Sequence, residues 1–570
     1  RSLGTRQATL AATGDTVARA NGKFVAQVRR NVNGDLKSFT ADEVTDGTLL
    51  SFVNESFTSS LPLDVAGSAA AAYGLRNLSS SYDGNVVEVR RSSDDTTRDF
   101  TAAEITDGTL LAFVGTGGSD NGFVKTWYDQ SGNSKNAAQA TAANQPKIVS
   151  AGALVTGGLD FDGSDDFLTN DTAIMNNAAN AYASVVLSRT STTSNEIPLS
   201  FPADSTGNRG FDLRLSSGTT SQLSIRTSAG SSNASGSFAT ASGSNVLLTG
   251  TFNAGLSSDE VKFFGNGSLV GSASNSGSGL INNGDNGGLF IGRFGSPTNF
   301  GAHLNGKVEE VIVYTSDQSD KRRAIEESIA GHHGITLGSF NRDGFVKTWY
   351  DQSVTNEAGD TATGNHATQA TAASQPKIVS AGALLNELDF DGTDDFLDIG
   401  GTGTNPLGIG ATDPLSIYTV QIASANAILG DDSNRHLRFQ PTAIQYYLST
   451  NVINESYGST VSSTEFSLFS TNFGGTGATS LVQGHANGVA ASTSDAQQGT
   501  SGANTAASPI EFIGARGSGT RSLLFEKSVK EIIIYVSDQS ANRTALEANI
   551  GETYSITGIP AYDNEVDGFV

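Results

Sequence analysis

Short runs of alternating or β-branched apolar residues recur along the chain, with breaks of Gly, Ser and Asn between them. Five of these runs follow one another closely: SVVLSRT (184–190), FDLRLSS (211–217), QLSIRTS (222–228), NVLLTGTFN (245–253) and VKFFGNGSLVGS (261–272). Half-buried strands show this alternation, and close, even breaks are typical of β-sandwiches and barrels. The Gly265-Asn266-Gly267 step predicts a tight hairpin. The pattern therefore predicts an all-β fold.

Two further runs lose the alternation, EEVIVYTS (309–316) and KEIIIYVS (530–537). This pattern indicates strands that are buried on both faces. A short helix is predicted after each of them. The first would begin after Ser316 or Asp317, with one of these residues as its cap, and the second would begin after Asp538. The apolar positions that support the first helix are Ala324, Ile325 and Ile329.

A capping box predicts one more helix start in the N-terminal half of the chain. Thr101 stands at the N-cap position and Glu104 three residues later, the spacing at which the two side chains bond each other's backbone N–H. Gly108 interrupts the run at a cost of about 1 kcal/mol relative to Ala. The segment therefore predicts either two short turns or one weak helix that ends near Gly115.

The chain repeats itself at two scales. GFVKTWYDQS (122–131) recurs unchanged at 344–353, an offset of 344 − 122 = 222 residues. A duplicated unit of about 220 residues has the size of a whole domain. On a smaller scale, residues 25–53 match residues 86–114 without gaps, and the second large copy has no such head. Three more segments recur in the large repeat, 137–154 at 367–384, 159–168 at 388–397 and 307–329 at 528–550.

These repeats predict tandem jelly-roll sandwiches with a few short helices. The predicted segments are a partial module head or linker at 1–60, a first module at 61–337, a second module at 338–558, and the start of a further, truncated repeat at 559–570. The last residues repeat the Asp-Gly-Phe-Val of 343–346, so we expect the chain to be a segment of a longer repetitive polypeptide.

Composition removes several classes of protein. The 570 residues include 34 Lys+Arg and 58 Asp+Glu, a net charge of −24, which disfavours binding to nucleic-acid phosphates. No apolar run approaches the roughly 18–20 residues that span a bilayer. The absence of Cys excludes disulfides, thiolate metal sites and cysteine nucleophiles. The 29 Phe and 13 Tyr supply β cores that disordered chains lack.

Several strings resemble known families. Residues 69–100 and TWYDQSGN (126–133) resemble the start of the α-L-arabinofuranosidase B catalytic domain, which is a concanavalin A-like β-sandwich. LDFDGSDDFL (159–168) and FFGNGSLVGS (263–272) resemble laminin-G-like modules of the same superfamily. In tandem copies, such modules resemble those of bacteriophage tail-fibre (virion) proteins and of large bacterial adhesins. The resemblance implies two concanavalin A-like modules, but a fold of this kind hosts many activities.

The resemblance also implies where catalytic carboxyl groups would lie. The arabinofuranosidase family is a retaining one and needs a carboxylate nucleophile close to a carboxylic acid. By resemblance, the nucleophile lies on a mid-domain strand and the acid in a loop after a glycine-rich strand. The mid-domain strands here carry Asp212 but no Glu, and Arg293 and Phe294 stand where the acid loop would open. The second copy, EFIGARGSG (511–519), also lacks an acid there. We therefore expect the chain not to be an enzyme.

Clustered aspartates provide the candidate metal ligands. Carboxylates gathered at a Gly turn can supply the oxygen ligands that Ca²⁺ prefers. The alternative is a hairpin in which the Asp side chains accept hydrogen bonds from the turn backbone, and we favour this alternative. Calcium is thus a possible cofactor, and no other cofactor is implied. The candidate ligands are Asp162, Asp165 and Asp166 in the first copy and Asp391, Asp394 and Asp395 in the second.

Aromatic residues provide the candidate carbohydrate-binding sites. Trp127 with Tyr128, and Trp349 with Tyr350, could form a platform on which a sugar stacks. The alternative, which we favour, is a packed aromatic followed by a buried Asp that ties a loop. The adjacent His332 and His333 are expected to face solvent or to complement a helix C-terminus rather than to bind metal. In Arg29-Arg30 and Arg90-Arg91, one arginine of each pair is expected to face inward.

Together these observations predict a multi-module fibre protein. We expect a structural or adhesion protein of a virion or surface appendage, with tandem lectin-like modules that bind host cell-surface glycans. Its partners would be other virion or fibre subunits, and we expect it to form homo-oligomers. We expect no nucleic-acid partner and no membrane span. Its location would be the virion or the extracellular surface. The alternatives are an arabinofuranosidase-like glycoside hydrolase and a bacterial surface adhesin.

Overall fold

The structure is a computed structural model that describes most of the chain between residues 24 and 559. The described ranges are 24–115, 118–190, 195–204, 208–216, 220–282, 288–295, 302–353, 364–400, 405–410, 413–432, 436–448, 451–457, 460–473, 482–495, 510–517 and 521–559. The predicted start of a further repeat at 559–570 therefore lies, apart from its first residue, outside the described residues.

The chain forms two compact units, and one of them is discontinuous in sequence. Ser56–Phe340 form one unit, called here the inserted unit, and Arg1–Glu55 together with Asn341–Val570 form the other, called the split unit. These units differ from the predicted segments. The described residues of 1–60 do not form a separate partial module, because those up to Glu55 belong to the split unit and those from Ser56 belong to the inserted unit. The part up to Glu55 pairs through one of its strands with residues that follow position 341.

The inserted unit consists of short strands and four helices among its described residues. Its helices are α3 (Pro62–Val65), α4 (Ala102–Thr106), α5 (Thr109–Val114) and α6 (Arg322–His333), with a 3-10 turn at Ala142–Asn144. Its strands are β3 (Ala71–Gly74), β4 (Asn85–Arg91), β5 (Thr97–Thr101), β6 (Gly122–Trp127), β7 (Ala137–Ala138), β8 (Lys147–Ser150), β9 (Ala153–Leu154), β10 (Leu159–Asp162), β11 (Leu168–Asn170), β12 (Asn180–Arg189), β13 (Glu196–Pro202), β14 (Arg209–Leu215), β15 (Thr220–Thr227), β16 (Gly230–Ser237), β17 (Val246–Asn253), β18 (Val261–Gly265), β19 (Ser268–Ala273), β20 (Leu289–Ile291) and β21 (Asn305–Tyr314).

The split unit repeats this plan. Its described helices are α1 (Ala41–Thr45), α2 (Thr48–Val53) and α7 (Arg543–Tyr554), with 3-10 turns at Ala372–Ser374 and Ser540–Asn542. Its strands are β1 (Phe24–Arg30), β2 (Leu36–Thr40), β22 (Gly344–Trp349), β23 (Ala367–Thr368), β24 (Lys377–Ser380), β25 (Ala383–Asp389), β26 (Leu397–Asp398), β27 (Leu415–Ile422), β28 (Leu429–Gly430), β29 (His436–Phe439), β30 (Ala443–Leu448), β31 (Asn451–Ser456), β32 (Phe466–Phe473), β33 (Val482–Ala486), β34 (Val489–Ala490), β35 (Ser492–Asp495), β36 (Phe512–Ile513) and β37 (Ser528–Tyr535).

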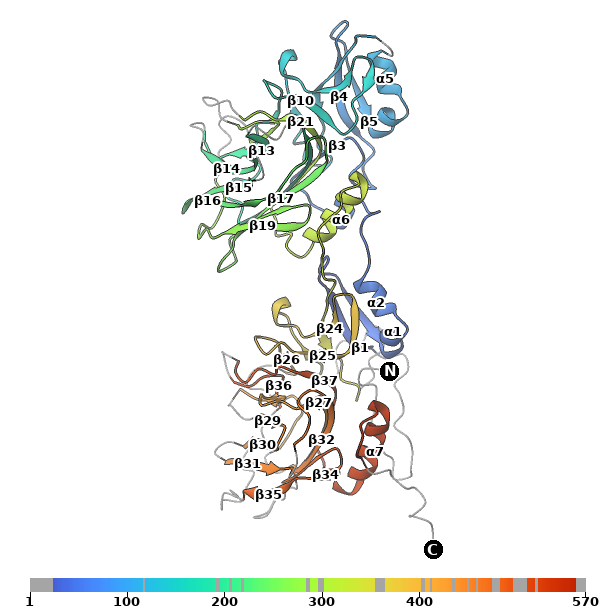
Figure 1. The fold of residues 1–570 in the computed structure, drawn as a ribbon, viewed down its shortest axis with the longest axis vertical. Coiled ribbons are helices and arrows are strands. Elements are labelled where there is room, and N and C mark those ends of the chain that lie inside the picture. The colour runs from blue at the N-terminus through green and yellow to red at the C-terminus, as the bar shows by residue number, and fades with distance from the viewer. Residues whose placement is uncertain are drawn as a thin grey trace. The chain divides into compact units, whose positions relative to one another are not determined.

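The inserted unit is a sandwich of two antiparallel sheets with a helix on the outside. The back sheet has the order β3-β21-β12-β17-β18-β19, and the front sheet has the order β7-β11-β20-β13-β14-β15-β16. Alternation along β12 divides its side chains between two cores, because successive residues of a strand point to opposite faces. Val185 packs between the sheets, whereas Val186 packs with Ile325 and Ile329 of α6, which lies along the back sheet (Figure 1). On β21, Val311 and Val313 likewise lie in the core between the sheets, whereas Ile312 and Tyr314 lie in the core under α6, so the interpretation of this non-alternating run as a strand buried on both faces is confirmed.

The split unit is built in the same way. Its strand β27 pairs with β32 on one side and with β37 on the other, as β12 pairs with β17 and β21. Tyr418 and Val420 of β27 pack against Leu546 and Ile550 of α7. The predicted fold class, all-β with tandem concanavalin A-like sandwiches and a few short helices, is confirmed. In the part of the chain that the structure describes, no helix is long and apolar enough to cross a membrane.

Local signals predicted several boundaries correctly. Thr101 caps α4 in a capping box with Glu104, and Gly108 has φ +89° between α4 and α5, so the segment forms two short helices. Asn266 and Gly267 take φ +45° and +77° in the hairpin between β18 and β19. The predicted start of α6 was wrong. The helix begins at Arg322, because Asp317 Oδ1 instead accepts from the backbone N–H of Ser319 at 2.9 Å in a turn.

Candidate functional site

The first Trp-Tyr-Asp-Gln segment is a structural tie in the inserted unit. Trp127 is 0% exposed in the core, so its ring offers no face on which a sugar could stack. Tyr128 is half-buried, and its hydroxyl donates to Asp99 Oδ1 at 2.7 Å. Asp129 Oδ1 accepts from the backbone N–H of Ala72 at 2.9 Å. These contacts are those expected of a packed aromatic and a loop-binding aspartate.

The second copy of this segment is less deeply buried. Trp349 is half-buried and packs against the core of the split unit. The hydroxyl of Tyr350 lies 2.9 Å from Ser38 Oγ, and its ring centroid is 5.0 Å from that of His366. Asp351 Oδ1 accepts from the backbone N–H of Ser353, as in a loop tie. The carbohydrate platform stays a prediction for the partly exposed aromatic residues.

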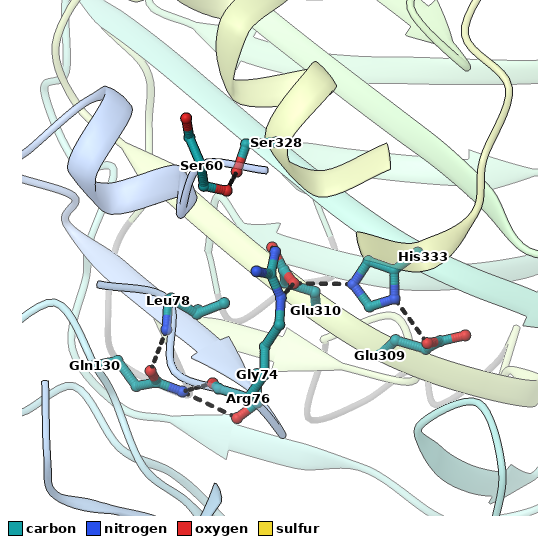
Figure 2. Close-up of polar contacts among 9 residues, drawn as sticks. All are labelled: Ser60, Gly74, Arg76, Leu78, Gln130, Glu309, Glu310, Ser328 and His333. Atoms are coloured by element: carbon teal, nitrogen blue, oxygen red, sulfur yellow. Dashed lines mark hydrogen bonds and ion pairs between the residues drawn. The ribbon is translucent and has the colours of Figure 1, made fainter. Parts of the chain in front are cut away.

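A polar network connects Gln130 of the first Trp-Tyr-Asp-Gln segment with His333 at the end of helix α6 (Figure 2). Gln130 Nε2 donates to the backbone carbonyls of Gly74 and Arg76 at 3.0 and 2.9 Å. Arg76 Nε in turn donates to Glu310 Oε2 at 2.9 Å. His333 Nε2 lies 2.9 Å from the same oxygen.

His333 is therefore not a solvent-facing residue, which corrects that part of the prediction. Its side chain is 6% exposed, and its two ring nitrogens lie 2.8 Å from Glu309 and 2.9 Å from Glu310. Burial lowers the pKa of His333, but the hydrogen bonds to Glu309 and Glu310 outweigh burial and raise it to about 9. The imidazolium stabilises the attachment of α6 to β21.

The geometry of the first aspartate cluster is compatible with both of its predicted roles. Side-chain oxygens of Asp162, Asp165 and Asp166 lie within 4.8 Å of one another, an arrangement that could hold a metal ion. Asp162 Oδ1 also accepts from the backbone N–H of Ser164 at 2.7 Å, as in the favoured hairpin interpretation. Burial and the negative charge of Asp162 raise the pKa of Asp166 to about 7. The cluster thus carries like charges that a cation would relieve.

The second cluster has the same geometry. Oxygens of Asp391, Asp394 and Asp395 again lie within 4.8 Å of one another. Asp391 Oδ1 accepts from the N–H of Thr393 at 2.7 Å, and the N–H of Asp391 donates to Asp395 Oδ2 at 3.0 Å. Burial and the charges of Asp391 and Asp394 raise the pKa of Asp395 to about 7. Calcium stays a prediction at both clusters.

The front sheet of the inserted unit carries a row of polar residues on its outer face. In register, Ser200 on β13 lies opposite Asp212 on β14, and Asp212 lies opposite Ser224 on β15. The neighbours Phe211 and Leu213 point into the core between the sheets. Asp212 is 0% exposed, its Oδ1 accepts from Ser200 Oγ at 2.7 Å, and its Oδ2 has no hydrogen-bond partner.

Two arginines flank this buried carboxyl group. Arg209 Nε lies 3.9 Å from Asp212 Oδ2, and its guanidinium carbon is 5.7 Å from the ring centroid of Phe294. Arg214 is half-buried, and its Nε has no hydrogen-bond partner. Burial raises the pKa of Asp212 to about 7 and lowers the pKa of Arg214. At neutral pH a partly protonated Asp212 therefore cannot neutralise both guanidinium groups.

The split unit has the corresponding face with one important difference. The strand register places His436 where the inserted unit has Asp212, and Arg438 where it has Arg214. Arg516 Nη1 lies 3.2 Å from His436 Nδ1. The arginine is thus present at this position in both sandwiches, whereas the buried carboxyl group belongs to the inserted unit.

Sequence reasoning named Asp212 without predicting its surroundings. The alternation of FDLRLSS placed Asp212 and Arg214 on one face, opposite the apolar residues between and around them. That signal was available, but it predicts a face and not its burial. The approach of Arg209 and Ser200 depends on strand pairing, which the sequence does not reveal.

Comparisons with known proteins agree with this architecture. Residues 161–321 match the family model of the concanavalin A-like lectin/glucanase superfamily, so the chain contains a domain of that superfamily. No curated protein matches the chain.

Solved structures that resemble the chain include enzymes and carbohydrate-binding modules. A GH54 α-L-arabinofuranosidase soaked with a cyclic sulfate inhibitor is 16% identical, with 59% of this chain and 83% of that chain covered and a TM-score of 0.34. The CBM40 of the Ruminococcus gnavus IT-sialidase, bound to α2,3-sialyllactose, is 15% identical, with coverages of 25% and 80% and a TM-score of 0.23. A pentraxin from Limulus polyphemus is 13% identical, with coverages of 30% and 81% and a TM-score of 0.23. At these identities the likeness concerns the fold alone.

The expectation that the chain is not an enzyme was wrong, because glycoside hydrolase activity should not have been excluded. Glycoside hydrolases of family GH54 stand among the matched structures, including an arabinofuranosidase complexed with arabinofuranosyl-α-1,2-xylobiose. The exclusion depended on finding no acid pair at two positions inferred from sequence. Asp212, the carboxyl group that the sequence had already placed on a mid-domain strand, is buried, and burial raises its pKa to about 7.

Proposed function

We propose that the inserted unit recognises glycans on the outer face of its front sheet, around Asp212. The observation that carries this proposal is the buried polar row Ser200, Asp212 and Ser224 with two flanking arginines. Most polar groups on a sheet face are either solvated or paired, and a buried unpaired oxygen costs about 1–3 kcal/mol. Such a cost is tolerated where the groups serve a ligand.

The chemistry of the face suits a sugar. Saccharide hydroxyls both donate and accept hydrogen bonds, and an aromatic ring beside polar groups is the usual composition of a small-molecule site. Arg209 and Arg214 would donate to hydroxyl or carboxylate oxygens, and Phe294 would contact an apolar sugar face. Ser200, Asp212 and Ser224 are themselves buried, so the partly exposed Arg209 and Arg214 would make the direct contacts with the sugar, and the buried row would hold the arginines in place.

The test is binding of the full chain to a panel of surface polysaccharides by titration calorimetry. A hydrogen bond to a charged group contributes about 1.5–3 kcal/mol, so Arg214→Ala should weaken binding roughly 10- to 100-fold. Arg98→Ala is the matched control, because Arg98 is 45% exposed and lies on β5, outside the front sheet. Equal affinities for wild type and Arg214→Ala, or an equal loss in Arg98→Ala, would refute this site.

A second candidate is glycoside hydrolysis, which Asp212 favours. A carboxyl group with a pKa near 7 is protonated in part of the molecules at neutral pH, the state that a general acid needs. The test is release of aryl alcohol from a chromogenic α-L-arabinofuranoside by the full chain. Turnover that disappears in Asp212→Asn would support the proposal. Undiminished turnover in that variant would exclude Asp212 as the acid.

We further propose that the chain works as a fibre or adhesion protein of a virion or cell surface. Its tandem sandwiches and its acidic composition, with a net charge of −24 and 66 Gly, support this context. Antibody labelling of intact particles and cells in electron micrographs would test the location. Labelling confined to the cell interior would contradict it.

A further inference from the structure

An edge strand closes one side of the back sheet in the inserted unit. Strand β3 pairs with the second half of β21, in a register that aligns Ala72 with Ile312. The backbone carbonyl of Val313 also accepts from the N–H of Ala70 at 2.7 Å. With this strand in place, the side chains of Val311–Tyr314 are 0% exposed. β3 therefore completes the burial of an apolar strand.

The corresponding edge of the split unit has no such strand among its described residues. Strand β37 matches β21 without gaps, and Ile533 occupies the position of Ile312. One side of β37 pairs with β27 from Val529 to Tyr535, whereas on the other side β25 reaches only the first two residues of β37. Residues Ile532–Tyr535 are half-buried, unlike their counterparts. The second half of β37 is thus an open sheet edge, to which another strand can add.

A tyrosine hydroxyl shows what is missing at this edge. In the inserted unit the hydroxyl of Tyr314, the last residue of β21, donates to the backbone carbonyl of Ala66, which precedes β3. The hydroxyl of its counterpart Tyr535 is buried and has no hydrogen-bond partner. A buried polar atom without a partner costs about 1–3 kcal/mol. The described part of the split unit thus lacks the carbonyl that the segment before β3 supplies.

A glutamine of the repeated Trp-Tyr-Asp-Gln segment leads to the same stretch of chain. Gln130 Oε1 accepts from the backbone N–H of Leu78, shortly after β3, at 2.9 Å. In the second copy, Gln352 Oε1 is buried and has no hydrogen-bond partner. Both missing partners therefore correspond to one stretch of the inserted unit, residues 66–78, which contains β3.

The order of the chain indicates which residues can supply this stretch. The duplicated head repeats at an offset of 86 − 25 = 61 residues, which places residues 5–17 opposite residues 66–78 and residues 10–13 opposite β3. Residues 10–13 lie outside the described residues. Their sequence, Leu-Ala-Ala-Thr, is uncharged, as is the Ala-Ala-Tyr-Gly of β3, and it contains no proline.

The connector favours the chain's own segment over a second copy. By the same offset, the stretch between residue 13 and β1 has the length of the stretch between β3 and β4. Strand β1 is itself paired within the split unit, with β22. A short connector to a fixed strand gives the attached segment a high effective concentration at the edge, which a separate molecule must exceed.

We propose that residues 10–13 of the same chain add to the second half of β37 as an antiparallel edge strand, with Ala11 opposite Ile533. Such addition depends on backbone hydrogen bonds, with side-chain pockets for alternate residues. The flanking backbone would supply the groups that Tyr535 and Gln352 lack. Asp15 stands where the inserted unit has Arg76, so strand pairing holds the segment without the ion pair that Arg76 makes with β21.

Hydrogen exchange of the unaltered full chain tests the pairing. The carbonyl of Val313 faces β3, and the N–H and carbonyl of one residue in an antiparallel strand point to the same side. The amides of the counterpart Ile534 and of Ile532 therefore face the open edge. We expect both to exchange as slowly as those of Val313 and Val311. Exchange at the rate of unprotected amides would overturn the proposal.

Engineered cysteines identify the occupant, since the chain contains none of its own. The full-length double variant Ala11→Cys/Ile533→Cys should form a disulfide within one chain, in a share that does not change with protein concentration. Directly opposed antiparallel residues have the Cα separation that a disulfide needs. Thr13→Cys/Ile533→Cys is the matched control, because its two positions share a face but stand two residues out of register. Equal yields in the two variants would indicate random collision and would overturn the proposal.

Two further preparations complete the test. Ala72→Cys/Ile312→Cys, an opposed pair in the inserted unit, gives the yield that a correct register produces. No internal bond in Ala11→Cys/Ile533→Cys under the same conditions would contradict the proposed pairing. Single variants Ala11→Cys and Ile533→Cys, mixed and oxidised, should stay monomeric. A disulfide-linked dimer in that mixture would assign the edge to a second copy and overturn the proposal.

Discussion

His333 offers the sharpest prediction, because it is buried between two carboxylates of one strand. Its pKa rises from an ordinary value of about 6.5 to about 9 in the folded protein. At 1.36 kcal/mol per pKa unit, that difference amounts to about 3 kcal/mol below pH 6 and about 2.5 kcal/mol at pH 7. The side chain is 6% exposed, so solvent screening reduces this value little.

The sign of the pH dependence follows from the raised pKa. The folded state binds the proton more tightly than the unfolded state, so the stabilisation is complete below about pH 6.5 and is lost as pH rises through 9. Replacement of His333 by Ala removes the imidazolium and leaves Glu309 and Glu310 without it. We expect the inserted unit to lose about 2.5 kcal/mol at pH 7, which lowers its Tm by about 5–10 °C.

Scanning calorimetry of the full chain at pH 7 and pH 10 measures this effect. The wild type and His333→Ala should differ widely at pH 7 and much less at pH 10, because the histidine is then neutral in both states. His332→Ala is the control, since His332 is exposed and adjacent. The reasoning fails if His333→Ala costs less than about 1 kcal/mol at pH 7, or if its deficit is the same at both pH values.

Three more predictions concern turns and acidic clusters. Gly108→Ala, and equally Gly47→Ala, should destabilise by about 1–2 kcal/mol in chemical denaturation, because both glycines have φ near +90° and their Cβ atoms would meet nothing; an unchanged midpoint would contradict this cause. Because the pKa values of Asp166 and Asp395 are raised in the folded protein, these carboxyl groups make it less stable as pH rises from about 4 to 7. Asp395→Asn should therefore raise Tm at pH 7 and leave it unchanged near pH 4. A Tm gain of the same size at both pH values would show that the titration of Asp395 is not the cause. Calcium should raise Tm and EDTA should lower it again, with a smaller gain in Asp391→Asn, whereas an unchanged Tm would leave the aspartates as turn acceptors.

Local sequence signals predicted what depends on near neighbours. The hairpin at Asn266 and the capping box at Thr101 depend on φ preferences and hydrogen bonds within four residues, and both were predicted correctly. The start of α6 was missed because Asp317 can cap a turn or a helix, and the choice depends on how the segment leaves β21. A local pattern cannot decide between two local uses of the same side chain.

Site chemistry was predictable only in its composition. The aspartate clusters were recognised from sequence, but the burial of Asp166 and Asp395 was not, whereas the packed Trp127 and the buried Asp129 were expected. A buried carboxyl group such as Asp166 acquires its pKa from desolvation and from neighbouring charges, and both depend on packing. His333 was expected to face solvent because nothing in its own segment indicates that Glu309 and Glu310 approach it from another element.

The sequence by itself determined the β-sandwich class, the two large copies and the duplicated head, since these depend on periodicity and on direct repetition. Only the tertiary structure decided which body the first head completes and which polar residues are buried together. The sequence alone does not tell which GFVKTW strand the head at 24–54 pairs with, because the two strands are identical. The choice is made by chain connection: residues 115–121 hold the second head to β6, so β22 is left for the first.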